Sequence, residues 1–179
     1  MSVFPYKGQM PDVAEDVFIA PTASVVGDVR IGAGTNIWFG SVVRGDVNSV
    51  VIGKHTNVQD NATIHTMSDA PTIIGDHVTI GHNAVVHCSK VGSNCLIGMG
   101  SVLIGYSEIG DNCVIGADTF IAQHKKNPFR LSGLWQSCQN YQGAAGGRAG
   151  GLESFHRELL SLRADLCQGA GGIRCQGKG

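Results

Sequence analysis

The chain has 179 residues, enough for one domain with a sizeable core, and a formal net charge of −1. This balanced charge, with no basic stripe or aromatic series, argues against nucleic-acid binding. Residues 1–16 lack the apolar core of a signal peptide, and no apolar run reaches membrane-spanning length. We therefore expect a cytoplasmic protein with neither a nucleic-acid nor a membrane partner.

Aliphatic residues recur about every six positions, and a small residue follows four places after most of them. Before a short loop these positions are Ile19, Val25, Ile31, Ile37, Val43, Ile52, Val58 and Ile64. After the loop they are Ile74, Ile80, Val86, Val91, Ile97, Leu103, Ile109, Ile115 and Ile121. Such fixed-period self-similarity indicates a solenoid, in which each turn buries its inner face against its neighbours.

A six-residue period suits a three-sided prism, in which three hexapeptides make one coil of about eighteen residues and parallel strands stack about 4.8 Å apart. The 17 units predict five to six triangular coils, and glycine takes the second place in many units. We expect an all-β parallel β-helix domain over residues 1–126. Cys95 and Cys113 fall at small inward places, so we expect buried free thiols there.

The repeat stops after Lys126, and residues 127–179 are Gly-rich without a clear period. One stretch, 152–166, has leucines and a phenylalanine at helical spacing. We therefore expect a separate tail that is weakly ordered or partly helical.

Three histidines interrupt the repeat. His65 and His87 are each second in their unit and three units apart, so they are expected to stack one coil apart on the same edge. Arg44 holds the same place one coil earlier. The three residues are thus predicted to form one vertical column.

His82 is third in its unit, with Asp60 at the matching place one coil earlier and Gln59 beside it. One prism edge does not readily bring His82 to His65 and His87, whereas a neighbouring subunit can. Three imidazoles with an open fourth position are typical of catalytic zinc. Stacking alone is weak support, because His55 and His77 are also expected to stack one coil apart, as exposed edge residues.

The strings RGD (44–46), NVQDNATIH (57–65) and GHNAVVH (81–87), together with the repeat over about residues 10–126, resemble the γ-class carbonic anhydrases of the hexapeptide-repeat superfamily. This resemblance implies a left-handed β-helix and a homotrimer with zinc, or iron or cobalt, at each subunit interface. It implies His65 and His87 as ligands from one chain and His82 as the ligand from its neighbour.

The resemblance also implies roles for four polar residues. Arg44 and Asp46 match an intersubunit ion pair, while Gln59 and Asp60 match residues that position the metal-bound water and the substrate. The implied reaction is attack of zinc-bound hydroxide on carbon dioxide to give bicarbonate, which makes the protein a carbonate dehydratase (a lyase).

The chain departs from the archetypal γ-class carbonic anhydrase in two places that affect the expected activity. Val47 follows Asp46 where the archetype has a glutamate, and the short loop after His65 offers only Asp69 as an acid. This pattern resembles the short-loop branch, whose members vary in activity. Three alternatives stay open: a hexapeptide-repeat acyltransferase that uses acetyl-coenzyme A, an acyl-coenzyme A thioesterase, and a non-catalytic metal-binding scaffold.

The tail departs from the family, whose members end in a Pro-rich turn, a GNPAK-like segment and a helix. A shift of one nucleotide lets residues 127–142 encode IPSGSLVYGNPAKIIR, which is family-like. We therefore hypothesise that residues 127–179 are a frameshift product.

Overall fold

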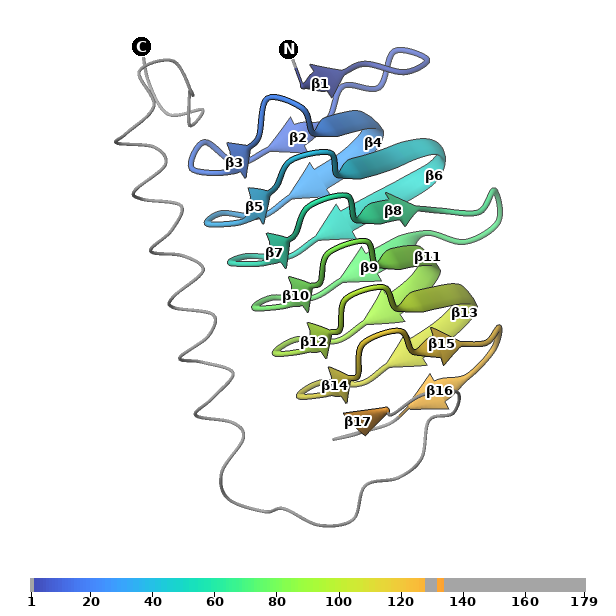
Figure 1. Cartoon of the computed structure of the whole chain (residues 1–179). Coiled ribbons are helices and arrows are strands. Elements are labelled where there is room, and N and C mark those ends of the chain that lie inside the picture. Colours follow the sequence, from blue (N-terminus) through green and yellow to red (C-terminus); the bar gives the residue numbers. More distant parts are fainter. Residues whose placement is uncertain (1, 128–131, 134–179) are drawn as a thin grey trace, which may run out of the picture.

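The computed structural model describes residues 2–127 and 132–133, which form a stack of short strands (Figure 1). Every strand pair is parallel, and the strands fall into two hydrogen-bonded sheets. The ten-stranded sheet contains β1 (Val3–Phe4), β2 (Asp12–Val13), β4 (Ser24–Ile31), β6 (Val42–Ile52), β8 (Thr63–His65), β9 (Thr72–Ile74), β11 (Val85–Val91), β13 (Val102–Ile109), β15 (Phe120–Ile121) and β16 (Lys126–Asn127). The seven-stranded sheet contains β3 (Phe18–Ile19), β5 (Asn36–Ile37), β7 (Asn57–Val58), β10 (Thr79–Ile80), β12 (Leu96–Ile97), β14 (Val114–Ile115) and β17 (Ser132–Gly133).

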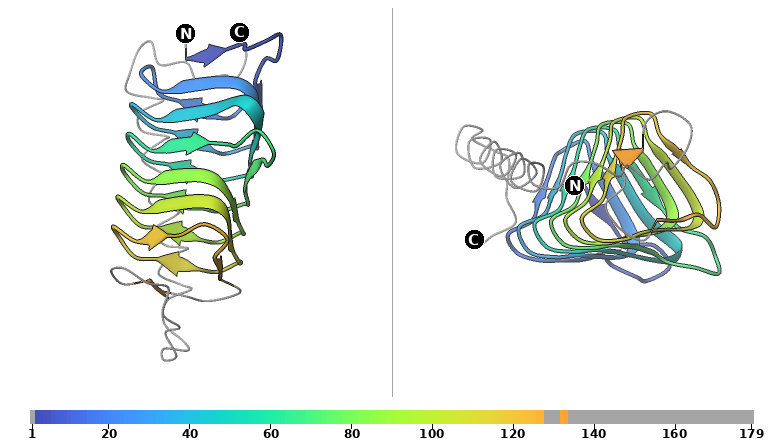
Figure 2. Two further views of the ribbon diagram at one scale, coloured as in Figure 1. Left: turned by 90° about the vertical axis from the view of Figure 1, so that its right-hand side faces the viewer. Right: turned by 90° about the horizontal axis from the view of Figure 1, so that it is seen from below.

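The ten-stranded sheet covers two sides of the prism, because its long strands bend at a corner. The β4–β6 register shifts between Gly27 and Val29, and the β11–β13 register shifts between His87 and Ser89. With the seven-stranded sheet this gives three faces, and the coils outline a triangle when viewed along the stack (Figure 2). The expected left-handed parallel β-helix class is therefore confirmed as an all-β solenoid.

The solenoid has about seven turns, against the expected five to six. The six-residue period runs from Ile19 to Ile121, whereas the structure adds strand pairing beyond both of these residues. At the N-terminal end β1 and β2 both pair with β4, outside the six-residue period. At the other end β16 pairs with β13 and β17 with β14.

The repeating aliphatic residues fill the interior. One inward ladder, with each member fully buried, comprises Val25, Val43, Ile64, Val86, Leu103 and Ile121. Two further ladders line the other faces, and together they form one continuous core cluster. Each turn thus supplies apolar area that only its neighbours can cover, which is the stabilising principle of a solenoid.

The small inward residues close the corners by hydrogen bonding between coils. Thr35 Oγ1 donates to the Gly53 carbonyl at 2.8 Å, and Thr56 Oγ1 donates to the Gly75 carbonyl at 3.0 Å. The glycines at the second place are needed for close stacking, since a Cβ on Gly53 would lie 2.5 Å from the Gly75 carbonyl carbon. Backbone approach of this kind leaves no room for a side chain.

Cys95 and Cys113 are buried free thiols, as expected. A hydrogen bond with Cys113, together with burial, raises the pKa of the Cys95 thiol. Within the described residues, no helix is long and apolar enough to cross a membrane. The frameshift and helix hypotheses concern the tail, which lies outside the described residues except at Asn127 and 132–133.

Candidate metal centre

Strand register places Arg44, His65 and His87 in one outward column. Val43 pairs with Ile64 and Ile64 with Val86, so the residue after each of the three takes an equivalent position on its coil. His65 and His87 are direct partners across β8 and β11, with ring centroids 5.1 Å apart and planes tilted by 52°. Counting hexapeptide units thus located a real juxtaposition of side chains that are 22 positions apart in the chain.

Asp46 joins two members of the column. Its Oδ2 accepts a hydrogen bond from Arg44 Nη1 at 2.5 Å, and its Oδ1 lies 2.8 Å from His65 Nε2. Burial works to raise the pKa of Asp46. Hydrogen bonds to His65 and to its own backbone act in the other direction, as do the charges of Arg44 and His65, and the pKa is lowered overall. Asp46 is therefore ionised at neutral pH and orients the His65 ring. This Arg44–Asp46 pair lies within one chain, and the intersubunit pairing implied by the resemblance stays a prediction.

His87 is a half-buried member of the column. Burial lowers the pKa of His87, and the nearby His65 and Arg44 charges lower it further against the opposing effect of a backbone hydrogen bond. His87 is therefore neutral at neutral pH. A neutral imidazole keeps a ring lone pair, which is the form that binds a metal ion.

His82 belongs to a different part of the prism. It follows β10, and Asp60 follows β7 one coil earlier. Asp60 Oδ2 lies 3.0 Å from His82 Nδ1, in keeping with their matching places on successive coils. The carboxylate holds Nδ1, so the nitrogen directed away from Asp60 is Nε2. Carboxylate contacts of this kind orient metal-ligating histidines in known metal sites.

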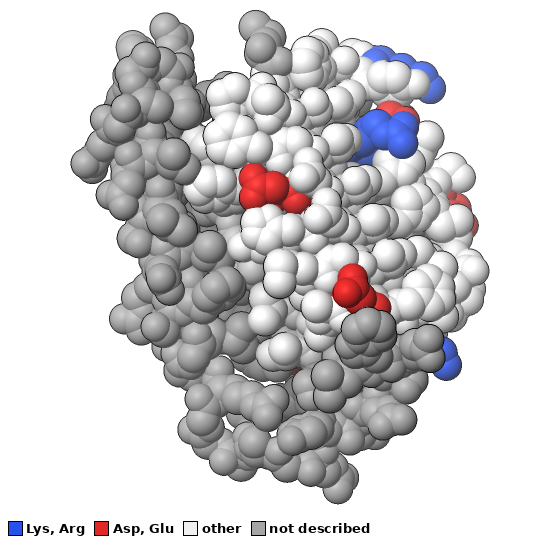
Figure 3. All heavy atoms as spheres, viewed as in Figure 1, with Lys and Arg blue, Asp and Glu red and all other residues white. Residues whose placement is uncertain are grey.

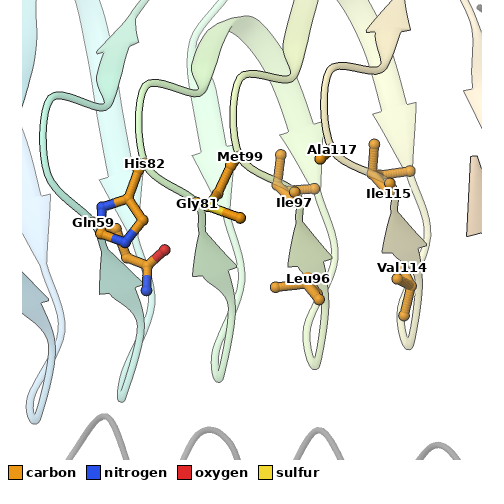
Figure 4. Close-up of a pocket in the computed structure, with 11 residues that line it drawn as sticks. Gln59, Gly81, His82, Leu96, Ile97, Met99, Val114, Ile115 and Ala117 are labelled. Atoms are coloured by element: carbon orange, nitrogen blue, oxygen red, sulfur yellow. The ribbon is translucent and has the colours of Figure 1, made fainter. Parts of the chain in front are cut away.

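Gln59 and His82 stand side by side at one end of an apolar groove (Figure 4). The groove has a volume of about 320 Å³ and continues over Leu96, Met99 and Val114 of the next two coils. Met99 is 56% exposed. The face that carries this groove has few charged side chains (Figure 3). Exposed apolar surface of this kind is typical of a contact surface.

The face that bears the column is also apolar. Residues two places before each column position point to the same side of their strands. Val42, Thr63 and Val85 hold these places and are half-buried. Their register partners on the later coils are Val102, which is half-buried, and Phe120, which is 51% exposed. The two histidine groups thus lie on two different faces, each with apolar neighbours.

The three histidines do not meet in one chain. No group of three or more His, Cys, Asp or Glu side chains able to hold a metal occurs among the described residues of a single protomer. His55 and His77 do stack as expected, with ring centroids 5.1 Å apart and planes inclined by 20°, but they belong to no such group either. A three-histidine site therefore requires a second chain.

Comparison with known proteins identifies relatives that share the hexapeptide-repeat fold. The family model "Bacterial transferase hexapeptide (six repeats)" matches residues 11–45 and 88–123. A solved hexapeptide transferase family protein from Anaplasma phagocytophilum is 32% identical with a TM-score of 0.79, over 90% of this chain and 96% of the other. A solved putative acetyltransferase from Bacillus cereus is 33% identical with a TM-score of 0.86, over 89% of this chain and 93% of the other.

Two curated relatives point to a branch within that fold. Carbonic anhydrase from Geobacillus kaustophilus is 45% identical over 102 residues, which are 57% of this chain and 56% of the relative. Mitochondrial gamma carbonic anhydrase 2 from Arabidopsis thaliana is 41% identical over 134 residues, which are 72% of this chain and 47% of the relative. The chain thus spans about half the length of these relatives. It belongs to the hexapeptide-repeat family and is a γ-carbonic anhydrase-like member of it.

Sequence reasoning did not single out Tyr106. Its hydroxyl donates to Asp69 Oδ2 at 2.6 Å, between segments 37 positions apart. The available signal was an aromatic residue at a corner of the repeat, which is not distinctive without the loop's position in space.

Proposed function

We propose that this protein is a γ-carbonic anhydrase-like metalloenzyme that hydrates carbon dioxide to bicarbonate. Its metal, zinc or alternatively iron or cobalt, is bound between chains by His65 and His87 of one protomer and His82 of its neighbour. The observation that carries the proposal is the stacked His65–His87 pair on one face, with His82 turned to another. The names of the curated relatives support the same activity.

The residues present suit zinc. Imidazole nitrogens bind Zn²⁺ at about 2.0–2.1 Å, and catalytic sites keep three protein ligands and one open position. His65 and His87 are adjacent, and the lowered pKa of His87 favours its ligand form. A bound zinc ion would supply Lewis acidity, which makes water acidic enough to react near neutral pH.

Carboxylates contact two of the three proposed ligands in the isolated chain. Asp46 orients His65 through Nε2 contact in the isolated chain, and Asp60 orients His82 through Nδ1. If zinc binds His65 Nε2, Asp46 must leave that nitrogen. The Asp46 carboxylate would then pair with Arg44 alone, within the chain or across the interface. Gln59 is buried beside His82, where its amide can hydrogen-bond a small polar molecule.

Metal sites that are each shared by two neighbouring chains are complete in every chain only when the chains form a closed ring. The His65–His87 face and the His82 face are different surfaces, so a contact between them is heterologous and closes into a ring when the rotation permits. A homotrimer is the ring that the family resemblance implies. The apolar residues around both histidine groups would be covered in such an assembly.

The test measures metal per chain together with mass in solution, on protein purified without chelator or affinity-tag metal, followed by carbon dioxide hydration. We expect a trimer with about one metal per chain. A trimer that stays metal-free after reconstitution with zinc would contradict the proposal.

A mixing experiment tests whether the site is shared. We expect His82→Ala and a His65→Ala/His87→Ala double variant each to lose metal and activity. When the two proteins are unfolded, mixed in equal amounts and refolded, each mixed trimer regains one of its three sites. Random assembly should restore about a quarter of the wild-type metal and activity. A site built within one chain would restore none.

A second candidate function is acyl transfer from acetyl-coenzyme A. It is favoured by the likeness to the putative Bacillus cereus acetyltransferase, which covers nearly the whole chain. Acetyl-coenzyme A should then bind to metal-free protein and raise its melting temperature. The metalloenzyme proposal expects no such shift, and thioester hydrolysis rates would separate a thioesterase from both.

A further inference from the structure

The groove beyond His82 is bordered by two rows of apolar side chains. Leu96 and Val114 form one row, and Met99 and Ala117 form the other (Figure 4). Ile80 pairs with Ile97, so Met99 holds the same place on its coil that His82 holds one coil earlier. The row that contains Met99 is therefore a direct continuation of the position of His82 along the stack.

The position of His82 along the stack lies between those of His65 and His87. The chain passes through β8, β10 and β11 in that order, and His82 comes five residues before His87. Met99 likewise comes five residues before Ile104, which is the register partner of His87 on the next coil. Met99 therefore lies between His87 and Ile104 along the stack, in the same way that His82 lies between His65 and His87.

This spacing fixes which coils face each other across a shared site. In the proposed site His82 of one chain meets His65 and His87 of its neighbour. The contacts in a closed ring are identical, and rotation about an axis parallel to the stack shifts no chain along it. The coils of both chains repeat about every 4.8 Å. One coil beyond the metal site, Met99 of the first chain then faces His87 and Ile104 of the second.

The two facing columns also match in polarity. Counted two places after the paired residues of the seven-stranded sheet, the first column contains Phe39, Asp60, His82 and Met99. The second column contains Val26, Arg44, His65, His87 and Ile104. The five-residue spacing brings the apolar ends of the two columns together and keeps the polar residues between them. Phe39 and Met99 are 36% and 56% exposed in the single chain, and this arrangement covers both.

We infer that Ile104 of one chain enters the groove beside Met99 of its neighbour, so that Met99 forms an apolar wall of the shared metal site next to His87. This inference rests on the proposed function, because the shared site determines which coils meet. It assigns the groove to a second copy of this chain instead of to a substrate. Met99 then excludes water from the side of His82 that lies opposite Asp60, where a polar wall would admit it.

The first test uses wild-type protein, which contains a matched control residue. Met10 is 58% exposed, and it precedes β2, which pairs with the end of β4 away from both histidine columns. Hydrogen peroxide transfers one oxygen atom to the sulfur of an accessible methionine and leaves water. Since Met10 and Met99 are almost equally exposed in the single chain, they should react alike there. In the assembled protein we expect Met99 to react about tenfold more slowly than Met10, as measured by peptide mass spectrometry.

The second test examines the contact between the two side chains. In the Met99→Cys/Ile104→Cys variant, a short bis-maleimide should link the introduced thiols of neighbouring chains through two thioether bonds and give a covalent trimer on a denaturing gel. Each single variant controls for the native cysteines. In a Met99→Cys/Phe4→Cys variant the second thiol lies at the far end of the same column, and we expect no linkage.

The outcomes separate this inference from the proposed function. A metal-loaded trimer in which Met99 reacts as fast as Met10, or in which Met99→Cys/Ile104→Cys gives no more linkage than the single variants, would overturn the inference alone. Protein that stays monomeric after zinc is supplied would overturn the shared site, and this inference with it.

Discussion

Replacing Asp60 by asparagine tests whether its carboxylate orients His82, the proposed metal ligand that lies apart from the column. Asp60 Oδ2 lies 3.0 Å from His82 Nδ1. Asparagine has nearly the same shape, but its neutral oxygen is a weaker acceptor from an imidazole N–H. Its amide nitrogen can face Nδ1 instead, which favours the tautomer with the proton on Nε2. That tautomer removes the lone pair with which His82 would bind the metal.

The expected size follows from the exposure of the pair. Loss of a carboxylate that orients a metal-bound histidine generally costs about 10- to 100-fold in metal affinity. In the single chain the side chains of His82 and Asp60 are 41% and 37% exposed, so water competes for the contact. We therefore expect the lower end, about a tenfold weaker zinc affinity. Asp16→Asn, which removes a carboxylate from the first coil, should leave affinity unchanged.

The assay is competition with a chromophoric zinc chelator on protein whose mass in solution is measured in the same samples. The trimer should persist, because the substitution preserves volume and removes no apolar surface. An Asp60→Asn protein that binds zinc as tightly as wild type, while His82→Ala loses it, would refute the orienting role. Dissociation into monomers would show instead that Asp60 acts on assembly.

Three further predictions concern the solenoid. Ile64→Ala, at a fully buried position, should lower the free energy of unfolding by about 3 kcal/mol in urea titrations, whereas Thr63→Ala on the outer face should cost much less. Gly53→Ala should destabilise by about 1–3 kcal/mol, because its Cβ meets the backbone of the next coil; unchanged stability would show that the coils can separate at this corner. Cys95 and Cys113 should resist iodoacetamide at pH 8 in the folded protein and react after unfolding, since burial and a raised Cys95 pKa keep that thiol protonated.

The six-residue period was enough to predict the solenoid and the vertical alignment of its residues. A six-residue period is a local property, so counting units from Val43 to Ile64 to Val86 was enough to align the positions that follow them. Parallel stacking then places equivalent positions one coil apart, whatever the side chains. Because His82 is third in its unit and the other two histidines are second, the same count also assigned His82 to a different place on the prism from His65 and His87.

The contacts between polar side chains could be identified only in the folded chain. The Asp46 bridge, the Asp60–His82 contact and the Tyr106–Asp69 bond depend on rotamers, on a register shift and on a loop that leaves the repeat. The terminal turns were undercounted for a related reason, since β1 and β2 pair with β4 through backbone hydrogen bonds that need no six-residue period. Periodic burial specifies a backbone path, while polar contacts depend on geometry that the period does not encode.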